Sequence, residues 1–395
     1  MNNKINIIQF LPYYPPHKGG LETHAQQWGK HWYEKGYGRV YNIISDVYQT
    51  SDHKSPILFE GKIIGYIQDG VENLIAPTIE VINNFPIYKI YSPEYVRIIK
   101  YLDEKNVDRV ITRTRFFLTS LIGGIYARRK KIHWCHIEHG SDYIKLQSPF
   151  KNLIGYIYDR LLGKWIFNRA DSLVGVSFAC RDFICSKFVD KQVDVIYRGV
   201  ELPKITHNNQ LKNKFPNKTI IGFVGRLYKW KNVDSLIRAY YTLDKKILDK
   251  SQLVIVGNGE DLERLKKLDT KKIVYFTGEK SGKEAVNLQD QFDIHVHSSS
   301  PGGGLATTLL QAIGLGKSIV ATPYEGAKEV MQNNMNGILL DDDRVESIVC
   351  GLDTAIRNVD RGSNYSSYNK KLFRKEFNWD ENIIKYYKLF GGTKK

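Results

Sequence analysis

The stretch that decides the fold spans residues 298–340 and reads SSSPGGGLATTLLQAIGLGKSIVATPYEGAKEVMQNNMNGILL. Three glycines, residues 302–304, lead into an apolar run over residues 305–313, and residues 318–321 read as a short buried strand. A glycine-rich loop at the start of a helix presents backbone N–H groups and the positive end of the helix dipole, which favour a phosphate. A turn that merely needs glycine is the alternative interpretation of the triplet.

The order of these elements resembles the donor half of the retaining glycosyltransferases of family 4 (GT-B superfamily, glycosyl transferases group 1). In that family a similar loop, helix and strand are followed by a Gly-x-x-Glu-Val element, here residues 326–330, and an Asn-Gly turn, here Asn336-Gly337. The resemblance implies an α/β fold of GT-B architecture, with two Rossmann-like doubly wound domains facing across a cleft. It also implies a nucleoside-diphosphate sugar as the donor substrate.

Length and composition limit the class of protein. A chain of 395 residues suggests two domains of roughly 150–200 residues each, and 42% hydrophobic residues suffice for ordinary cores. No apolar run reaches the ~18–20 residues of a membrane span, and the N-terminus reads as a first strand rather than a secretory signal. The four cysteines match no metal or disulfide spacing, which favours a reducing cytoplasm.

The net charge of +16 calls for a negatively charged partner. Nucleic acid is disfavoured because the chain has no recognised binding motif and no interleaved basic-aromatic platform. An anionic membrane surface fits better, because residues 105–131 are basic around an apolar patch at 116–127, and residues 150–169 read as a basic, aromatic-rich helix. The alternative is that both segments are core-facing helices with a solvated cationic side. The basic residues of the first segment are Lys105, Arg109, Arg113, Arg115, Arg128, Arg129, Lys130 and Lys131.

Two α/β halves follow one another along the chain. Strands separated by helices, with no long antiparallel meander, predict parallel sheets that are covered on both faces. Strands are expected at residues 5–10, 40–45, 109–112, 133–139, 172–176 and 194–197, and then at 219–225, 253–256, 273–277 and 294–297. The expected domains are an N-terminal acceptor-side domain (1–200), a linker (201–218), a C-terminal nucleotide-sugar domain (219–375), and a C-terminal helix and tail (376–395).

Arg226 and Lys231 follow the first strand of the second half, Arg226 within the sequence GRL and Lys231 five residues later. Arginine can fork onto two phosphate oxygens and lysine supplies a compact charge, so the pair suits a diphosphate. A solvated basic turn is the alternative. The pattern is similar to the family's Gly-Arg-Leu…Lys signature, which implies that both residues stabilise the nucleoside-diphosphate leaving group and are catalytic candidates.

Two motifs of the first half are similar to family motifs. The sequence GGLETH follows the first strand and resembles the family's Gly-Gly-x-Glu loop. This implies that Gly19 and Gly20 approach the donor, with Glu22 and His24 on the acceptor side, although a tight turn would also explain the glycines. His139 ends a strand and is followed by glycine, as in the family's His-Gly pair, whose histidine lies beside the donor sugar. It is the third catalytic candidate.

The family's most specific mark, a Glu-x(7)-Glu pair, is missing here, because its positions fall on Gly303 and Gln311. The resemblance implies that the second glutamate holds the ribose hydroxyls, which the amide oxygen of Gln311 can do more weakly for want of charge. It also implies that the first touches the donor sugar, for which Gly303 has no side chain; either backbone amides replace it or transfer is impaired. The remaining donor-site candidates are Gly304, Leu305, Thr307 and Thr308, whose N–H groups and hydroxyls suit a phosphate, and Glu279.

Other patterns suggest different chemistry. Residues 253–262, LVIVGNGEDL, read as a strand followed by a dinucleotide loop, with Glu279 about twenty residues later. However, Leu262 stands where such a loop has Gly or Ala, so a nicotinamide enzyme is only an alternative. No metal site is predicted, because histidines 133, 136 and 139 alternate between the faces of a strand and the acidic triplet 341–343 reads as a solvated loop.

The motifs together predict a glycosyltransferase, either hexosyl- or acetylhexosaminyl-, that moves a sugar from a nucleoside-diphosphate sugar to a glycan or lipid-linked acceptor. Retention, metal independence and a role in bacterial surface polysaccharide assembly are implied by the resemblance alone. The expected location is cytoplasmic, peripheral on the inner face of the cell membrane, with no cofactor and no nucleic-acid partner. The alternatives are a non-catalytic GT-B protein that binds nucleotide or glycan in an assembly complex, and a nucleotide-sugar epimerase.

Overall fold

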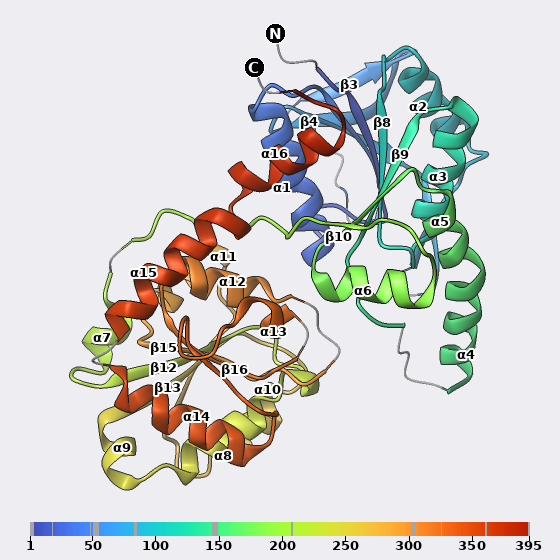
Figure 1. Cartoon of the computed structure of the whole chain (residues 1–395). Coiled ribbons are helices and arrows are strands. Elements are labelled where there is room, and N and C mark those ends of the chain that lie inside the picture. Colours follow the sequence, from blue (N-terminus) through green and yellow to red (C-terminus); the bar gives the residue numbers. More distant parts are fainter. Residues whose placement is uncertain are drawn as a thin grey trace. The chain divides into compact units, whose positions relative to one another are not determined.

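The computed structural model describes residues 4–17, 19–47, 49, 55–82, 85–143, 149–206, 208–301, 305–324, 326–359 and 362–393. The chain divides into two compact units, unit 1 with residues 1–199 and 379–395, and unit 2 with residues 200–378 (Figure 1). The division falls one residue before the expected end of the first domain. The expected linker lies in unit 2, and the expected separate tail lies in unit 1 from residue 379 onward.

Unit 1 is built on a mixed sheet whose described strands have the order β11-β10-β9-β8-β1-β2-β5-β4-β3. The strands from β11 to β5 pair in parallel, and β4 and β3 add an antiparallel edge. A separate hairpin joins β6 and β7. The bounds are β1 Ile7–Leu11, β2 Val40–Ser45, β3 Pro56–Phe59, β4 Lys62–Gln68, β5 Val71–Ala76, β6 Thr78–Ile82, β7 Phe85–Tyr88, β8 Arg109–Arg113, β9 His133–Glu138, β10 Ser172–Gly175 and β11 Asp194–Val195.

The sequence analysis did not predict the short antiparallel edge of this otherwise parallel sheet. Two tight turns join β3 to β4 and β4 to β5, and their central residues, Glu60-Gly61 and Asp69-Gly70, all have positive φ. Turns of this conformation connect antiparallel neighbours directly, and Asp-Gly is a characteristic sequence for them.

Helices cover both faces of the unit 1 sheet. Ile7 packs in the cluster that contains α1 and α16, whereas Ile8 packs in the cluster that contains α2, α3 and α5. In α3 a Cβ on Gly123 would overlap the Phe10 ring, and one on Gly124 would overlap Trp134. Gly123 and Gly124 of the apolar patch therefore face the core, whereas Ile125 is exposed. The bounds are α1 Gly20–Glu34, α2 Pro93–Asp103, α3 Leu118–Lys130, α5 Lys164–Arg169, α6 Phe178–Lys187 and α16 Trp379–Leu389.

Residues 149–169 form one long helix in three parts: α4 (Pro149–Tyr158), the π-helical turn η1 (Asp159–Gly163) and α5. Helix α5 packs in the core, whereas α4 extends away from the body of unit 1 in Figure 1. No helix in the described part of the chain is both long enough and apolar enough to cross a membrane. The exposed aliphatic side chains of α4 and η1 are Leu153, Ile154, Ile157 and Leu161, and Tyr156 is also exposed.

The C-terminal helix α16 completes the core of unit 1. Trp379 is buried and stacks on His31 with ring centroids 5.6 Å apart. Its indole also packs on Gly199, where a Cβ would overlap it. The Asn382 amide donates a hydrogen bond to the Tyr197 carbonyl oxygen at 2.9 Å. The tail is not a separate element, because its apolar face is buried against α1.

Unit 2 is built on a parallel sheet, and its described strands have the order β14-β13-β12-β15-β16-β17. Neighbours on both sides of β12 require crossovers in opposite directions, so the sheet is doubly wound, as predicted. The strands are β12 Thr219–Val224, β13 Ser251–Val256, β14 Val274–Gly278, β15 Ile294–His297, β16 Ser318–Ala321 and β17 Ile338–Leu339. The helices are α7 Gln210–Lys214, η2 Lys229–Lys231, α8 Val233–Thr242, α9 Lys245–Lys250, α10 Leu262–Leu268, α11 Gly282–Gln289, α12 Thr307–Gly314, α13 Gly326–Val330, α14 Val345–Arg357, α15 Gly362–Leu372 and η4 Phe373–Phe377.

The polar segment 201–218 is anchored to unit 2 and is not a free linker. The Thr206 N–H donates to the Asn287 side-chain oxygen at 2.9 Å. The Leu211 N–H donates to the Gln291 side-chain oxygen at 2.7 Å, and the Leu211 side chain is buried. The polar composition of this segment therefore reflects its exposed side, not an absence of packing.

Candidate functional site

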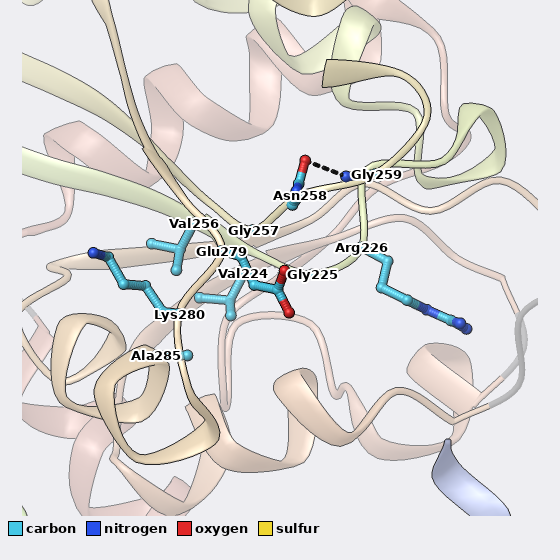
Figure 2. A pocket seen from close by; sticks show the side chains of 10 residues that line it. All are labelled: Val224, Gly225, Arg226, Val256, Gly257, Asn258, Gly259, Glu279, Lys280 and Ala285. Atoms are coloured by element: carbon cyan, nitrogen blue, oxygen red, sulfur yellow. Dashed lines mark hydrogen bonds between the residues drawn. The ribbon is translucent and has the colours of Figure 1, made fainter. Parts of the chain in front are cut away.

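A pocket of about 430 Å³ lies at the carboxyl ends of β12, β13 and β14 (Figure 2). This edge of a doubly wound sheet is where such folds bind ligands. Two sequence-predicted residues, Arg226 and Glu279, line it, and Figure 2 shows the exposed Arg226 side chain extending away from Glu279. The lining residues are Val224, Gly225, Arg226, Val256, Gly257, Asn258, Gly259, Glu279, Lys280 and Ala285.

The glycines of the GNG turn allow two loops of this pocket to pack together. Gly257 has a φ of 140°, a region that favours glycine, and a Cβ there would overlap the Gly225 carbonyl oxygen. A Cβ on Gly259 would overlap the Leu227 carbonyl oxygen. The Leu227 N–H donates to the Asn258 carbonyl oxygen at 2.8 Å. Loop packing thus explains the pattern that resembled a dinucleotide loop, and it adds pocket residues that the sequence prediction missed.

Lys231 lies in η2 and is tied to the end of β15. Its ammonium group donates to the Ser299 hydroxyl at 3.2 Å and lies 4.1 Å from the centre of the Trp230 ring. The Ser298 hydroxyl donates to the Lys231 carbonyl oxygen at 2.8 Å. The structure therefore places the Lys231 charge beside the residues that lead into the glycine-rich stretch, whereas Arg226 lies at the pocket.

Helix α12 begins where the apolar run of the sequence predicted a helix. Thr307 and Thr308 form its first turn, and no side chain caps its N-terminus. Both residues and Gln311 are half-buried. Because the first N–H groups of a helix have no partner within it, this end can donate to an anion.

The residues before α12 are only partly described. Leu305 is buried, and a Cβ on Gly326 would overlap it. The glycine of the Gly-x-x-Glu-Val element therefore lets α13 approach the chain just before α12. Gly303 and Gly304, two of the predicted donor contacts, lie outside the described residues.

The acidic triplet 341–343 makes local contacts. The Asp343 carboxylate accepts hydrogen bonds from the Ser300 hydroxyl at 2.5 Å and the Tyr324 hydroxyl at 3.2 Å. The Asp342 carboxylate lies 2.6 Å from the Arg344 guanidinium. In the described ranges, no group of three or more His, Cys, Asp or Glu side chains could hold a metal ion.

In unit 1, Gly19 and Gly20 lie at the start of α1. A Cβ on Gly19 would overlap the Glu22 carboxylate, which is buried and lies 2.7 Å from the His17 ring nitrogen Nδ1. The Arg198 guanidinium donates to the Gly20 carbonyl oxygen at 2.8 Å. Glu22 and Arg198 therefore hold the glycine loop from its two sides.

Glu138 organises the turn that carries His139. One carboxylate oxygen accepts the N–H groups of His139 at 3.0 Å and Gly140 at 2.8 Å. The other accepts the Arg115 N–H at 3.0 Å, and the Arg115 guanidinium also pairs with Asp159 at 3.0 Å. Burial would raise the pKa of Glu138, but the Arg115 charge and the hydrogen bonds lower it to about 2. The turn is therefore fixed by a charged carboxylate.

His24 and His139 meet edge to face, with ring centroids 4.9 Å apart. Burial, together with the Arg113 charge, lowers the pKa of both imidazoles well below the usual value. The Nε2 atoms of both rings are buried, and neither has a hydrogen-bond partner among the described residues. The structure thus brings together two of the predicted residues of unit 1, one proposed for the donor side and one for the acceptor side.

Arg113 and Arg115 were counted in a cationic surface, and this was wrong. Both are buried, with 0% and 2% of their surface exposed. The sequence TRTR contains no apolar residue, so it gave no sign of burial. Charged side chains can nevertheless be buried when they have partners. These arginines and Glu138 are the main site residues that the sequence prediction missed.

The two histidines of β9, His133 and His136, have different hydrogen-bond partners. His133 Nε2 lies 2.8 Å from the Ser172 hydroxyl, and His136 Nδ1 lies 2.8 Å from the Thr112 hydroxyl. Side chains three residues apart on a strand point to opposite faces, and the different partners of His133 and His136 agree with this.

The GT-B class of glycosyltransferases has two α/β units with a binding site at the carboxyl edge of a doubly wound sheet. This chain has two α/β units, and the second has a doubly wound sheet with a pocket at that edge. Two family models match the chain, "Glycosyltransferase Family 4" over residues 18–204 and "Glycosyl transferases group 1" over residues 205–372. The chain belongs to glycosyltransferase family 4. The predictions of family, fold class and enzyme class are confirmed, and the nicotinamide alternative is wrong.

Individual relatives agree with this assignment. The chain is 41% identical over 396 residues to an uncharacterized glycosyltransferase of Methanocaldococcus jannaschii, covering 98% of each chain. It is 25% identical over 312 residues to the UDP-Gal:alpha-D-GlcNAc-diphosphoundecaprenol alpha-1,3-galactosyltransferase of Escherichia coli, covering 74% of this chain and 76% of that one. The solved structure of Anabaena HepE in complex with UDP is similar in fold, with a TM-score of 0.71 at 15% identity, covering 98% of this chain and 99% of that one.

Proposed function

We propose that this glycosyltransferase moves a sugar from a nucleoside-diphosphate sugar to a glycan or lipid-linked acceptor in surface polysaccharide assembly, with retention and without a metal ion. The observation that carries the proposal is the pocket at the carboxyl edge of the unit 2 sheet. Arg226 lies at this pocket, while Lys231 and the uncapped end of α12 follow neighbouring strands at the same edge. The Escherichia coli relative, whose name specifies a UDP-sugar and a diphosphoundecaprenol acceptor, supports the substrate classes.

In this proposal the chain's own cations take the charge of the leaving diphosphate. Arg226 and Lys231 supply two positive charges, and the N–H groups at Thr307 and Thr308 supply hydrogen bonds. Gln311 holds the ribose through its amide oxygen. His139 and the backbone at Gly20 are the proposed contacts of the donor sugar.

Thermal shift against UDP, GDP, ADP, CMP and dTDP, with and without chelator, tests the donor site. A ligand at about 100 times its dissociation constant adds roughly 2.7 kcal/mol of stability, which raises the melting temperature measurably. We expect one nucleotide to stabilise the protein equally with and without chelator. Stabilisation that disappears with chelator would contradict metal independence, and no stabilisation by any nucleotide would contradict the donor site.

Turnover distinguishes this proposal from its two alternatives. The stabilising nucleotide identifies the candidate nucleotide sugars, which are incubated with the protein with and without an acceptor extract. We expect release of nucleoside diphosphate that depends on the extract. Nucleotide binding without turnover would support the non-catalytic partner, and conversion of the sugar without any acceptor would support an epimerase.

We further propose that α4 docks on an anionic membrane surface, where a lipid-linked acceptor would be found. The exposed aliphatic side chains of α4 and η1 lie on successive turns, four residues apart at 153, 157 and 161 with Ile154 beside Leu153, so they form one stripe. The exposed Arg160, Lys164 and Arg169 have no ion-pair partner in the part of the chain that the structure describes, so they are available to acidic headgroups. The stripe consists of Leu153, Ile154, Ile157 and Leu161.

Vesicle flotation tests the membrane proposal. We expect the protein to float with vesicles that contain anionic lipid and not with neutral ones. The variant L153Q/I157Q should lose flotation, whereas L58Q/I63Q, which changes two exposed side chains of β3 and β4, should keep it. Equal loss in both variants, or flotation with neutral vesicles alone, would contradict docking through α4.

A further inference from the structure

Arg113 is a buried cation whose hydrogen-bond partners, Gln9 and His24, carry no negative charge. Its side chain has 0% of its surface exposed, and no carboxylate of the described residues lies within ion-pair distance of it. Two of its nitrogens donate to the Gln9 side-chain oxygen at 3.2 and 2.5 Å, and the third lies 2.8 Å from His24 Nδ1. Burial lowers the pKa of Arg113 to about 10, so the guanidinium remains charged at neutral pH.

The contact with Arg113 determines where the proton of His24 lies. Arginine has no acceptor, so the Nδ1 atom of His24 must accept the hydrogen bond. A neutral imidazole whose Nδ1 accepts carries its proton on Nε2. The Nε2–H group is therefore a buried donor, and it has no acceptor among the described residues. An unused buried donor destabilises the protein, and an incoming acceptor relieves this cost.

We propose that Arg113 is a positioning residue that holds His24 as the neutral Nε2–H tautomer and keeps the adjoining His139 uncharged. The pair then offers uncharged hydrogen-bonding groups to the hydroxyls of a sugar substrate, and neither imidazole serves as a charged acid near neutral pH. This inference rests on the proposed transferase function, because that function supplies the sugar.

The charges around the two rings support it. His24 is faced by Arg113, Arg198 and His139. His139 is faced by these two arginines, by His136 and by Glu138, whose charge is engaged by Arg115. The other titratable groups that interact with the two arginines are Tyr386 and Cys135 near Arg113, and Glu22 near Arg198. The charges of Arg113 and Arg198, of which only Arg198 has a carboxylate nearby, therefore oppose protonation of both imidazoles.

A purely structural role is the competing explanation. Arg113 on β8 also bonds Gln9 on β1, so it could simply tie these strands to α1. Such a role predicts that loss of Arg113 lowers the melting temperature and the activity together at every pH. A positioning role predicts a pH-dependent loss and a change in the His24 nitrogens themselves.

Nitrogen-15 NMR of the full-length protein, labelled at histidine, reads the tautomer directly. His24 signals are assigned by comparison with H24Q. In the wild type we expect a neutral Nε2–H imidazole that does not titrate near the ordinary pKa of 6.5. In R113M, the Nδ1 signal should shift because its donor is gone, and titration should move toward that value.

If R113M does not fold, two substitutions of Gln9 test the proposal without replacing Arg113. Q9E gives the guanidinium a carboxylate partner, so the pKa values of His24 and His139 should rise and kcat should fall roughly tenfold more between pH 7.5 and 5.5 than in the wild type. Q9L, the matched control, leaves Arg113 charged and should leave the His24 tautomer unchanged.

Several outcomes would overturn the proposal. The first is that wild-type His24 carries its proton on Nδ1 or titrates near 6.5. The second is that the His24 nitrogen signals in R113M are unchanged. The third is that the pH profile of kcat in Q9E is identical to that of the wild type. If the wild type turned over no nucleotide sugar, the proposed function would fail, but the nitrogen signals would still decide whether Arg113 sets the tautomer.

Discussion

The Glu138 carboxylate and the Arg115 guanidinium lie 3.3 Å apart, and both side chains are buried. The same carboxylate accepts the backbone N–H groups of His139 and Gly140, and the same guanidinium pairs with Asp159 in η1. A single buried charge network therefore connects the proposed catalytic turn to the helix that exposes an apolar stripe. Because the two carboxylates share Arg115 but only one of them touches the turn, their roles can be separated.

We predict that E138Q lowers transferase turnover more than D159N does. Both substitutions remove a charge that pairs with Arg115, and breaking a buried pair costs about 3 kcal/mol or more. Only E138Q also weakens the acceptor for the His139 N–H group. Urea unfolding should show a stability loss in both variants, while kcat, measured where each variant is folded, falls much further in E138Q. Equal losses of kcat in the two variants would mean that Glu138 acts only through stability.

We predict that K231A reduces turnover roughly a hundredfold, because a charge aimed at the leaving group is worth about that much. The fold should be retained, since the Lys231 side chain lies outside the apolar cores and its ammonium group contacts the Ser299 hydroxyl and the Trp230 ring. K229A is the matched control, because Lys229 lies two residues earlier in η2 and is exposed. Steady-state kinetics with the stabilising nucleotide sugar provide the measurement. Wild-type turnover in K231A, or an equal loss in K229A, would contradict the assigned role.

The sequence predicted the local structure around the unit 2 candidate residues better than the contacts of the unit 1 candidates, for a physical reason. Strand ends, a helix start and a Gly-Arg-Leu turn are local patterns, so Arg226 and the start of α12 could be placed without knowing the tertiary structure. The contact of His24 with Arg113 joins positions 89 residues apart, and single-sequence patterns carry no record of such pairings. The antiparallel edge could have been predicted, because Asp69-Gly70 is a local turn signal.

We predict that G257A destabilises the protein by about 2 kcal/mol or more and abolishes nucleotide binding. A φ of 140° is strained for alanine, and the new Cβ would overlap the Gly225 carbonyl oxygen, forcing apart the loops that line the pocket. G282A is the control, because a Cβ there meets nothing within 4 Å. Thermal shift with and without the stabilising nucleotide measures both effects. Nucleotide binding of wild-type strength in G257A would show that this loop packing is not needed for the donor site.

We predict that the protein loses stability as the pH falls below 6.5, partly through His295 and His297. Burial lowers the pKa of each to about 3 from the ordinary 6.5. The unfolded chain therefore binds protons in this range that the folded chain does not, so the stability present above pH 6.5 is lost as the pH falls toward 3. Each histidine should cost about 2 kcal/mol at pH 5, since each pH unit is worth 1.36 kcal/mol.

Urea unfolding at pH 7.5 and pH 5 measures this loss in the wild type, H295Q and H297Q. At pH 7.5 all forms are uncharged at these positions, so differences there report the packing cost of each substitution. Between the two pH values each variant should lose about 2 kcal/mol less than the wild type. The same loss in all three proteins would show that these histidines are protonated in the folded state already at pH 5, and that their burial does not exclude charge.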